Sequence, residues 1–421
     1  MDKFIVKGKT PLRGDISISG SKNAALPLLA AALLTDEPVR FSNVPRLQDI
    51  YTFNNVLRVV GAQVQFLEEQ NQVHIDASNV NYLEAPYDLV RKMRASFYML
   101  GALVGKHGYA KVSMPGGCAW GPRPVDLHLK GLEAMGIQIT LDKGYVIAKA
   151  DNQVTGGSFR LEPSSVGATI NLILAAVLRA KSFRIENAAK EPDVVQLCRV
   201  LNEMGARIEG VGTDTLHIQK VDKLTGGTFR NDPDRIEVGT FMIAAAMHPD
   251  SHLRLLGCNA DHLGNFPELL RQTGAQVSID GETIEVKAPE VLQPVSITTG
   301  IYPGFPTDLQ AQWATMLTQA NGQSTVTDTV YFDRFSYVPE LSRLGAHLKV
   351  DQNKVSIQGP SKLEGASVMS TDLRASVSLV LAAMVAENSS EILRIYHLDR
   401  GYESLEGKLN AVGAKLTRAQ E

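Results

Sequence analysis

The sequence predicts an α/β fold that is built from six similar units. A short step, usually an apolar residue followed by Gly and Ala, recurs along the 421 residues at spacings of 68 to 75. Its glycines are Gly61, Gly136, Gly205, Gly274, Gly345 and Gly413. Residues 155–160 (TGGSFR) return in the same register as 225–230 (TGGTFR), and residues 94–96 (RAS) return as 374–376. A period of about 70 residues that fills the whole chain indicates a repeated supersecondary unit.

Each repeat glycine is expected to end an amphipathic outer helix. In residues 125–136, Leu129, Leu132 and Met135 keep near-helical spacing. Gly136 then follows, and a glycine can adopt the positive φ that stops a helix. The alternating residues 137–141 predict a strand directly after this helix.

A second, much more apolar helix is expected upstream in each unit. These helices are predicted over residues 24–34, 95–104, 168–178, 240–247, 311–317 and 375–385. A helix that is apolar nearly all round is a buried one. The sequence therefore predicts one central buried helix and one outer helix in each unit, with strands that connect them.

Polar and charged residues gather where the buried helices begin. The six starts are residues 21–23, 92–94, 165–167, 237–239, 308–310 and 372–374. Ser and Asp at such places can act as N-caps. Lys22, Arg94 and Arg374 cannot, because a cation is unfavourable at the positive end of a helix. If these helix ends meet in one cleft, they form an anion-binding site; solvated surface charges are the alternative.

The composition agrees with a soluble enzyme, and we expect it to be cytoplasmic. Lys and Arg number 42 against 45 Asp and Glu, so the net charge of −3 provides no basic field for nucleic acid. The apolar run 24–34 is shorter than the roughly 20 residues that span a bilayer, and the N-terminus has no signal-peptide pattern. Three widely spaced cysteines indicate reduced thiols. No Cys/His cluster has metal-ligand spacing, so we expect no metal.

One segment, residues 115–126 (PGGCAWGPRPVD), has no counterpart in the other units. Its glycines and prolines predict an exposed loop, where functional residues concentrate. Cys118 lies five residues from Arg123, and a nearby cation favours the thiolate. A buried, inert thiol is the alternative, and it is the interpretation that we accept for Cys198 and Cys258.

Six ordered motifs resemble the UDP-N-acetylglucosamine 1-carboxyvinyltransferases of the enolpyruvyl transferase family. They are residues 21–27 (SKNAALP), 115–118 (PGGC), 123–128 (RPVDLH), 305–308 (FPTD), 371–376 (TDLRAS) and 399–403 (DRGYE). The resemblance implies a two-domain enolpyruvyl-transferase fold with three repeats and buried central helices in each domain. One domain would comprise residues 22–229 and carry the Cys118 loop. The other would comprise residues 1–21 and 230–421, with the first strand of the chain joining it.

The resemblance also implies an activity. The enolpyruvyl group of phosphoenolpyruvate would pass to the 3-hydroxyl of UDP-N-acetylglucosamine, and phosphate would leave. This is the first committed step of peptidoglycan synthesis, and it needs no cofactor. Both substrates are small molecules, so neither nucleic acid nor a membrane is expected as a partner.

Cations for phosphoenolpyruvate follow from the same resemblance. Lys22, Arg123 and Arg400 would bind the phosphate, while Arg374 and Arg400 would bind the carboxylate. Arg suits both groups because its planar fork binds them bidentately. Lys22 and Asn23 would stabilise the tetrahedral intermediate, with preorganised positive charge as the main contribution to the rate.

Proton transfer would involve two further residues. Asp308 would be the base that takes the proton of the sugar hydroxyl, and Cys118 would be the acid that protonates the methylene carbon. Cys118 could also add covalently to phosphoenolpyruvate, and it would be the target of fosfomycin. Asp372, at the helix start equivalent to that of Asp308, would share in proton handling, cap its helix or pair with an Arg.

The nucleotide sugar would contact residues of both expected domains. These are Arg94, Arg123, Pro124, Val125, Asp126, Leu127, Pro163, Ser164, Ser165, Val166, Asp308 and Val330. Asp126 alone could be only a dipole partner, because it follows Pro124 at an ordinary helix opening. Two departures from the family pattern affect this region: Pro163 stands where many members have Lys, and residues 120–122 (WGP) are bulkier than usual.

Three more residues occupy positions that the family places near the cleft or the sugar. They are Asp234, Arg235 and Arg334. For Arg334 the alternative is an ion pair with Asp333 or Glu340.

Two other functions compete with this interpretation. The first is 5-enolpyruvylshikimate-3-phosphate synthase, which has the same fold and reaction but another acceptor; the PGGC and RPVDLH motifs argue against it. The second is a ring-shaped clamp around DNA, built from a sixfold α/β repeat. A clamp needs basic residues on many inner faces, whereas the central helices here are mostly apolar and the net charge is negative.

Overall fold

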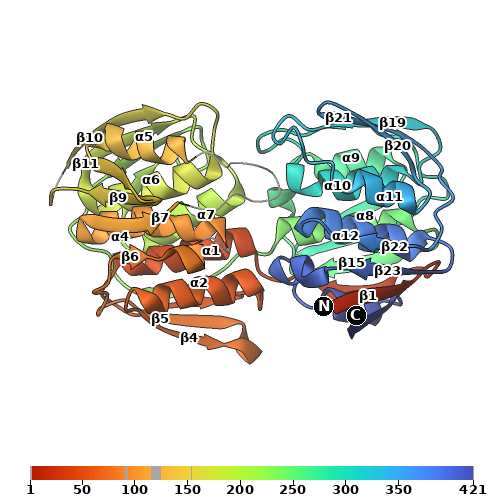
Figure 1. Cartoon of the computed structure of the whole chain (residues 1–421), viewed down its shortest axis with the longest axis horizontal. Coiled ribbons are helices and arrows are strands. Elements are labelled where there is room, and N and C mark those ends of the chain that lie inside the picture. Colours follow the sequence, from red (N-terminus) through yellow and green to blue (C-terminus); the bar gives the residue numbers. More distant parts are fainter. Residues whose placement is uncertain (1, 91–92, 115–124, 153, 421) are drawn as a thin grey trace. The chain divides into compact units, whose positions relative to one another are not determined.

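The protein divides into two compact units, which Figure 1 shows in a computed structural model. The structure describes residues 2–90, 93–114, 125–152 and 154–420. The N-terminal unit comprises Gly20–Asp232, and the C-terminal unit comprises Met1–Ser19 and Pro233–Glu421.

Among the described residues, the N-terminal unit contains three four-stranded sheets. The first is β14 (Gly227–Arg230), β3 (Val39–Ser42), β5 (Gln72–Asp76) and β4 (Gln63–Leu67). The second is β6 (Glu84–Ala85), β7 (Tyr109–Ser113), β9 (Tyr145–Lys149) and β8 (Gln138–Asp142). The third is β10 (Val154–Arg160), β11 (Ala180–Glu186), β13 (Thr215–Gln219) and β12 (Arg207–Glu209).

The described part of the C-terminal unit also contains three four-stranded sheets. The first is β2 (Arg13–Ser17), β15 (His252–Leu256), β17 (Thr283–Lys287) and β16 (Gln276–Asp280). The second is β18 (Ile297–Thr298), β19 (Gln323–Thr327), β21 (Lys354–Gln358) and β20 (His347–Asp351). The third is β22 (Ser367–Met369), β23 (Ser389–Leu393), β1 (Asp2–Lys7) and β24 (Lys415–Gln420).

Each of these sheets joins one parallel pair of strands to two antiparallel ones, and distant segments complete several of them. Strand β14 pairs in parallel with β3, so the end of the N-terminal unit closes back on its beginning. Strand β2 pairs in parallel with β15. Strand β1 lies antiparallel between β23 and β24, which makes the first strand of the chain part of the C-terminal unit.

The predicted central helices are confirmed. They are α1 (Lys22–Ala31), α4 (Tyr98–His107), α6 (Val166–Arg179), α8 (Arg235–Met247), α10 (Gln310–Leu317) and α12 (Leu373–Val385), and most of their side chains are buried. The stretch 95–104 was expected to be one helix, but it begins as the 3₁₀ helix η3 (Arg94–Phe97). Helices α4 and α6 lie very close together, since a Cβ at Gly101 would be 2.4 Å from the Asn171 carbonyl oxygen. Among the described residues, no helix is long and apolar enough to cross a membrane.

The outer helices end as predicted. They are α2 (Gln48–Val59), α5 (Asp126–Met135), α7 (Pro192–Glu203), α9 (Phe266–Gln272), α11 (Val338–Arg343) and α13 (Leu405–Ala411). The repeat glycine after each helix has a φ between 92° and 108°. A side chain in that region of φ is strained, so glycine is required there. The sequence repeat as a whole stays a prediction.

Candidate functional site

Asp308 in the C-terminal unit is held by two guanidinium groups. It lies in the 3₁₀ helix η5 (Thr307–Leu309), directly before α10. Its Oδ2 is 2.9 Å from Nη2 of Arg374, and its Oδ1 is 2.8 Å from Nη1 of Arg334. The side chains of Arg374 and Arg334 are 7% and 13% exposed, and that of Asp308 is 27% exposed. Each carboxylate oxygen of Asp308 is therefore paired with its own guanidinium group, and all three side chains are mostly shielded from solvent.

The charges of this cluster determine its protonation. Burial by itself would raise the pKa of Asp308, but the guanidinium groups of Arg374 and Arg334 more than reverse this. The pKa of Asp308 is consequently far below its ordinary value. Burial would lower the pKa of Arg374, yet Asp308 holds it above the ordinary value. The ion pair is thus fully charged at neutral pH.

Arg374 lies in the first turn of α12, where a cation is unfavourable because the helix dipole is positive there. Asp308 is the anion that compensates for it. The guanidinium of Arg374 also lies 3.5 Å from the hydroxyl oxygen of Tyr402, with the charge 6.0 Å from the centre of the ring. The Tyr402 hydroxyl is in turn 2.8 Å from that of Thr240, on α8. Asp308 and Tyr402 therefore fix the orientation of this guanidinium, and Thr240 in turn holds the Tyr402 hydroxyl.

Asp372 caps α12. Its Oδ1 accepts hydrogen bonds from the backbone N–H groups of Arg374 (2.9 Å) and Ala375 (3.2 Å), and its Oδ2 accepts one from the Ser336 hydroxyl (3.2 Å). Of the alternatives open from the sequence, the capping interpretation is the one that these contacts support. The ion pair with Arg374 is made by Asp308 instead.

Arg334 corrects one alternative from the sequence. It pairs with Asp308 and not with its neighbours Asp333 or Glu340. Glu340 instead accepts a hydrogen bond from the backbone N–H of Met369 at 2.8 Å. The Arg334 guanidinium is held toward Asp308 because it donates to the Thr307 hydroxyl at 3.1 Å.

Glu237 requires another correction, because it does not begin its helix. Helix α8 begins at Arg235, and Asp234 is its N-cap, which accepts from the backbone N–H groups of Ile236 (2.8 Å) and Glu237 (3.1 Å). Glu237 is buried in the first turn and pairs with Lys408 at 2.6 Å. Burial raises the pKa of Glu237 although Lys408 opposes this. We assign it a structural role.

Arg235 lies beside an aromatic ring. Its guanidinium is 5.6 Å from the centre of the Tyr302 ring. The Tyr302 hydroxyl donates to the backbone carbonyl of Asp261 at 2.9 Å, which anchors the ring.

The N-terminal unit has a similar arrangement at the start of α1. Ser21 caps this helix by accepting from the backbone N–H of Ala24 at 3.2 Å. Lys22 Nζ lies 3.2 Å from Oδ2 of Asp49, and the two side chains are 12% and 6% exposed. Asn23, the residue after Lys22, is partly buried. Here too a cation at a helix start is compensated by a carboxylate from another helix, α2.

The serines predicted to contact the sugar lie at the start of α6. Ser165 caps that helix and accepts from the backbone N–H of Ala168 at 3.3 Å. Ser164, Ser165 and Val166 are partly buried, whereas Pro163 is exposed and follows a cis peptide bond.

The start of α5 lies at the edge of the described segment. Val125 is buried, Leu127 is partly buried and Asp126 is exposed. Asp126 pairs with Lys130 at 3.4 Å, one turn later. This contact agrees with the alternative that Asp126 is an ordinary residue of the first helical turn.

Val330 and Arg400 are two further predicted site residues of the C-terminal unit. Val330, just after β19, is 39% exposed, and its N–H donates to Oδ1 of Asp328 at 2.9 Å. Arg400 is partly buried at the end of the 3₁₀ helix η6 (Ile395–Arg400).

Several predicted residues cannot be placed. Cys118, Arg123 and Pro124 lie outside the described residues, and of Arg94 only the backbone is described. The other two cysteines agree with the expectation of inert thiols. Cys198 is fully buried and Cys258 is 2% exposed, and burial raises the pKa of each to about 12.

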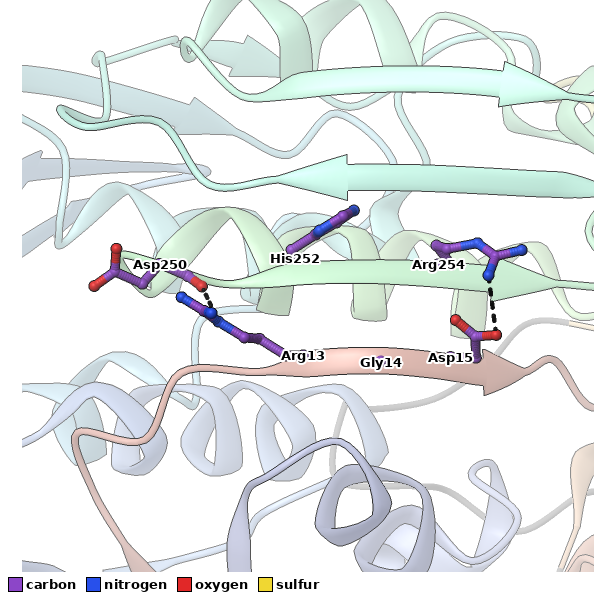
Figure 2. Close-up of a pocket in the computed structure, with 6 residues that line it drawn as sticks. All are labelled: Arg13, Gly14, Asp15, Asp250, His252 and Arg254. Carbon is purple, nitrogen blue, oxygen red and sulfur yellow. Dashed lines mark hydrogen bonds and ion pairs between the residues drawn. The ribbon is translucent and has the colours of Figure 1, made fainter.

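A shallow hollow elsewhere on the C-terminal unit is not the candidate site. It lies on the solvent face of β2 and β15 and is lined by Arg13, Gly14, Asp15, Asp250, His252 and Arg254 (Figure 2). Both arginine side chains that line it already have partners: Arg13 donates to the Asp250 backbone carbonyl at 3.0 Å, and Arg254 pairs with Asp15 at 3.3 Å. In the part of the chain that the structure describes, no cluster of three His, Cys, Asp or Glu side chains could hold a metal ion.

Three residues of these clusters were missed from the sequence. Asp49 carries no signal in the sequence, because its role depends on the packing of α2 against α1. Thr307 directly precedes Asp308 in the FPTD motif, and Asp328 follows the end of a strand. Their proximity to predicted residues was the only available indication.

Comparisons with known proteins show the family of the chain. The family profile described as EPSP synthase (3-phosphoshikimate 1-carboxyvinyltransferase) matches residues 6–409. The UDP-N-acetylglucosamine 1-carboxyvinyltransferases of Chlorobaculum parvum and Pectobacterium carotovorum are both 47% identical to the chain. The first match covers 100% of this chain and 99% of that protein, and the second covers 100% of both.

Solved structures are similar as well. The enolpyruvyl transferase NikO from Streptomyces tendae has a TM-score of 0.91 and 26% identity, with 100% of this chain and 99% of that chain covered. An EPSP synthase from Acinetobacter baumannii has a TM-score of 0.77 and 18% identity over 100% of both chains, a likeness of fold alone.

Proposed function

Because the chain belongs to the EPSP synthase (3-phosphoshikimate 1-carboxyvinyltransferase) family of enolpyruvyl transferases, we propose that it transfers the enolpyruvyl group of phosphoenolpyruvate to the 3-hydroxyl of UDP-N-acetylglucosamine. The observation that carries the choice of acceptor is the 47% identity, over the whole chain, to proteins named for that reaction. Its fold is that of the enolpyruvyl transferases, as the sequence predicted. The reaction would be the first committed step of peptidoglycan synthesis, and we place it in the cytoplasm.

The addition step needs two proton transfers, and the elimination that follows needs a third. The 3-hydroxyl oxygen forms a bond to C2 of phosphoenolpyruvate and gives its proton to Asp308, while an acid adds a proton to C3. The product is a tetrahedral phospho-ketal. A proton then leaves the new methyl group, the bond from C2 to the phosphate oxygen breaks, and the double bond re-forms as phosphate departs. Cys118 is our candidate for the acid.

Asp308 is a weak base while two guanidinium groups hold it. Its pKa is far below the ordinary value for that reason. Arg374 and Arg400 are the residues that we assign to the carboxylate of phosphoenolpyruvate. That carboxylate would compete with Asp308 for Arg374, and loss of one cation raises the pKa of Asp308. Substrate binding would thus convert a structural carboxylate into a general base.

In the N-terminal unit, Lys22 is the cation that we assign to the phosphate of phosphoenolpyruvate. Its ammonium group is held 3.2 Å from Asp49, so the amine is positioned before any substrate arrives. We assign it, together with Arg123, to the phosphate that leaves. Asn23, the next residue of the helix, would donate a hydrogen bond to the intermediate.

The nucleotide sugar is assigned to three further segments. They are residues 125–127 at the start of α5, residues 163–166 before α6, and Val330 after β19, together with Arg94, Arg123 and Pro124. Val330 is exposed enough, at 39%, to contact a ligand.

Shikimate 3-phosphate is the second candidate acceptor, because the matching family profile carries the name of that synthase. The test is phosphate release from phosphoenolpyruvate with UDP-N-acetylglucosamine, with shikimate 3-phosphate and with no acceptor. We expect release with the nucleotide sugar alone. Release with shikimate 3-phosphate would favour the second candidate, and no release with either would reject both.

A further inference from the structure

We infer that Asp328 and Thr307 are positioning residues that hold Arg334 on Asp308. The inference rests on the proposed function, because it concerns how the proposed base is kept in place. Asp328 follows β19 and is fully buried, whereas Thr307 directly precedes Asp308. Neither is among the residues that the sequence predicted to contact substrate.

Asp328 connects three segments of the C-terminal unit. Its Oδ1 accepts hydrogen bonds from the Thr299 hydroxyl (2.8 Å) and from the backbone N–H groups of Val330 (2.9 Å) and Tyr331 (2.8 Å). Its Oδ2 accepts one from the Thr307 hydroxyl at 2.7 Å. These four donors are neutral. Burying a carboxylate without a cation costs free energy of folding. If Asp328 only stabilised the turn, a neutral side chain could make the same hydrogen bonds without that cost.

The direction of the hydrogen bonds explains why the charge matters. An ionised carboxylate can only accept hydrogen bonds, so the Thr307 hydroxyl must be the donor in its hydrogen bond to Asp328. The lone pairs of Thr307 Oγ1 are then presented to Arg334, whose Nη1 donates to them at 3.1 Å. The same nitrogen lies 2.8 Å from Oδ1 of Asp308. The relay therefore runs from Asp328 through Thr307 and Arg334 to Asp308.

The relay acts on the oxygen of Asp308 that Arg374 does not hold. If phosphoenolpyruvate draws Arg374 away, Arg334 is the cation that stays. It then keeps Asp308 oriented and its pKa low enough to be ionised before it accepts the hydroxyl proton. Without Thr307, Arg334 can leave Oδ1, and the pKa of Asp308 rises.

Two matched substitutions test the inference. Thr307→Val and Thr299→Val each remove one hydroxyl that donates to Asp328. Of these two hydroxyls, only that of Thr307 also accepts a hydrogen bond from Arg334. We expect Thr307→Val to lower kcat roughly tenfold to a hundredfold, since it disturbs a hydrogen bond to a charged group. We expect Thr299→Val to keep kcat within about twofold, because two N–H donors remain on the same oxygen. Thr307→Ser, which restores the hydroxyl, should recover most of the loss.

The pH profile separates positioning from a general loss of structure. In Thr307→Val the acid limb of kcat/KM should move to higher pH, because Asp308 protonates more readily. Asp328→Asn should shift that limb in the same direction, and Thr299→Val should not. Equal kcat losses in the two Thr→Val variants without a shift of the limb, or failure of Thr307→Ser to rescue, would overturn the inference.

A measurement without substrate keeps the inference independent of the proposed function. Asp308 stabilises the fold through its lowered pKa, and that contribution disappears on acidification. Between pH 7 and pH 2 the thermal midpoint of Thr307→Val should fall less than those of the wild type and Thr299→Val, because folded Thr307→Val binds the Asp308 proton at a higher pH. Identical falls would reject the relay even in an active enzyme. If wild-type protein releases no phosphate, the proposed function fails, whereas a smaller fall in Thr307→Val would still support the relay.

Discussion

Asp308 and Arg374 are 66 positions apart in the chain, yet Oδ2 of one lies 2.9 Å from Nη2 of the other. Both stand at the starts of buried central helices, α10 and α12, whose apolar bodies pack in the same core. Because the helices are fixed by that core, the ion pair is held without any exposed loop. The pair explains how a cation is tolerated at a helix N-terminus, and it also sets the protonation state of the proposed base.

Asp308→Asn should nearly abolish turnover. Loss of a general base typically costs about 10²–10⁴ in rate. The substitution also leaves two neighbouring guanidinium groups without their anion, so the free energy of unfolding should fall by roughly 3–5 kcal/mol. Phosphate release and urea denaturation measure the two effects. Asp333→Asn changes an exposed carboxylate nearby and should alter neither by much; an active Asp308→Asn enzyme would contradict the assignment of the base.

Acid should destabilise the wild type more than it destabilises Asp308→Asn. The pKa of Asp308 is lower in the folded than in the unfolded state, where it is about 3.9. Its contribution to stability is therefore complete above that value and is lost as the pH falls toward the lower, folded pKa. Urea midpoints at pH 6 and pH 3 should fall further in the wild type. Parallel decreases in both proteins would show that Asp308 does not have a lowered pKa.

Lys22→Ala should lower kcat by about 10²–10³, the typical cost of removing one preorganised group that stabilises the transition state. Lys22→Arg keeps the charge that compensates Asp49 and should retain the stability of the wild type while losing part of the rate. Steady-state phosphate release and thermal denaturation distinguish the two requirements. The control is Lys7→Ala, at an exposed position of β1. Wild-type rates in Lys22→Ala would exclude the phosphate assignment.

Thiol reagents should modify Cys118 and leave the other cysteines intact. Cys198 and Cys258 are buried and have a pKa of about 12, so neither offers a thiolate at neutral pH. Fosfomycin should likewise form its adduct on Cys118, faster in the presence of the nucleotide sugar. Peptide mass mapping identifies the modified residue, and an adduct on Cys198 or Cys258 in native protein would refute the assignment.

Cys118→Asp should retain some activity, because a carboxylic acid can also deliver a proton. It should lose sensitivity to fosfomycin, since a carboxylate is a far poorer nucleophile toward an epoxide than a thiolate. Residual phosphate release with and without the inhibitor measures both properties. A Cys118→Asp protein that remained fully sensitive would place the target elsewhere.

The sequence by itself determined the local structure and the positions of the main charges. The spacing of apolar residues located the six buried helices, and Gly136 and its counterparts located the ends of the outer helices. Lys22, Arg374 and Asp308 were recognisable because each is polar at the start of an apolar helix. These features depend on near neighbours in the chain, so periodicity and residue type are sufficient to predict them.

Only the tertiary structure decided which charges meet. Arg334 could have paired with Asp333 or Glu340 on sequence grounds, yet it pairs with Asp308; Lys22 pairs with Asp49, which nothing in the sequence marked. Such contacts join separate helices and strands, and their distances follow from how the buried faces pack. An ion pair or a hydrogen bond forms or fails within about an ångström. That precision comes from the packed core, and no local pattern of residues contains it.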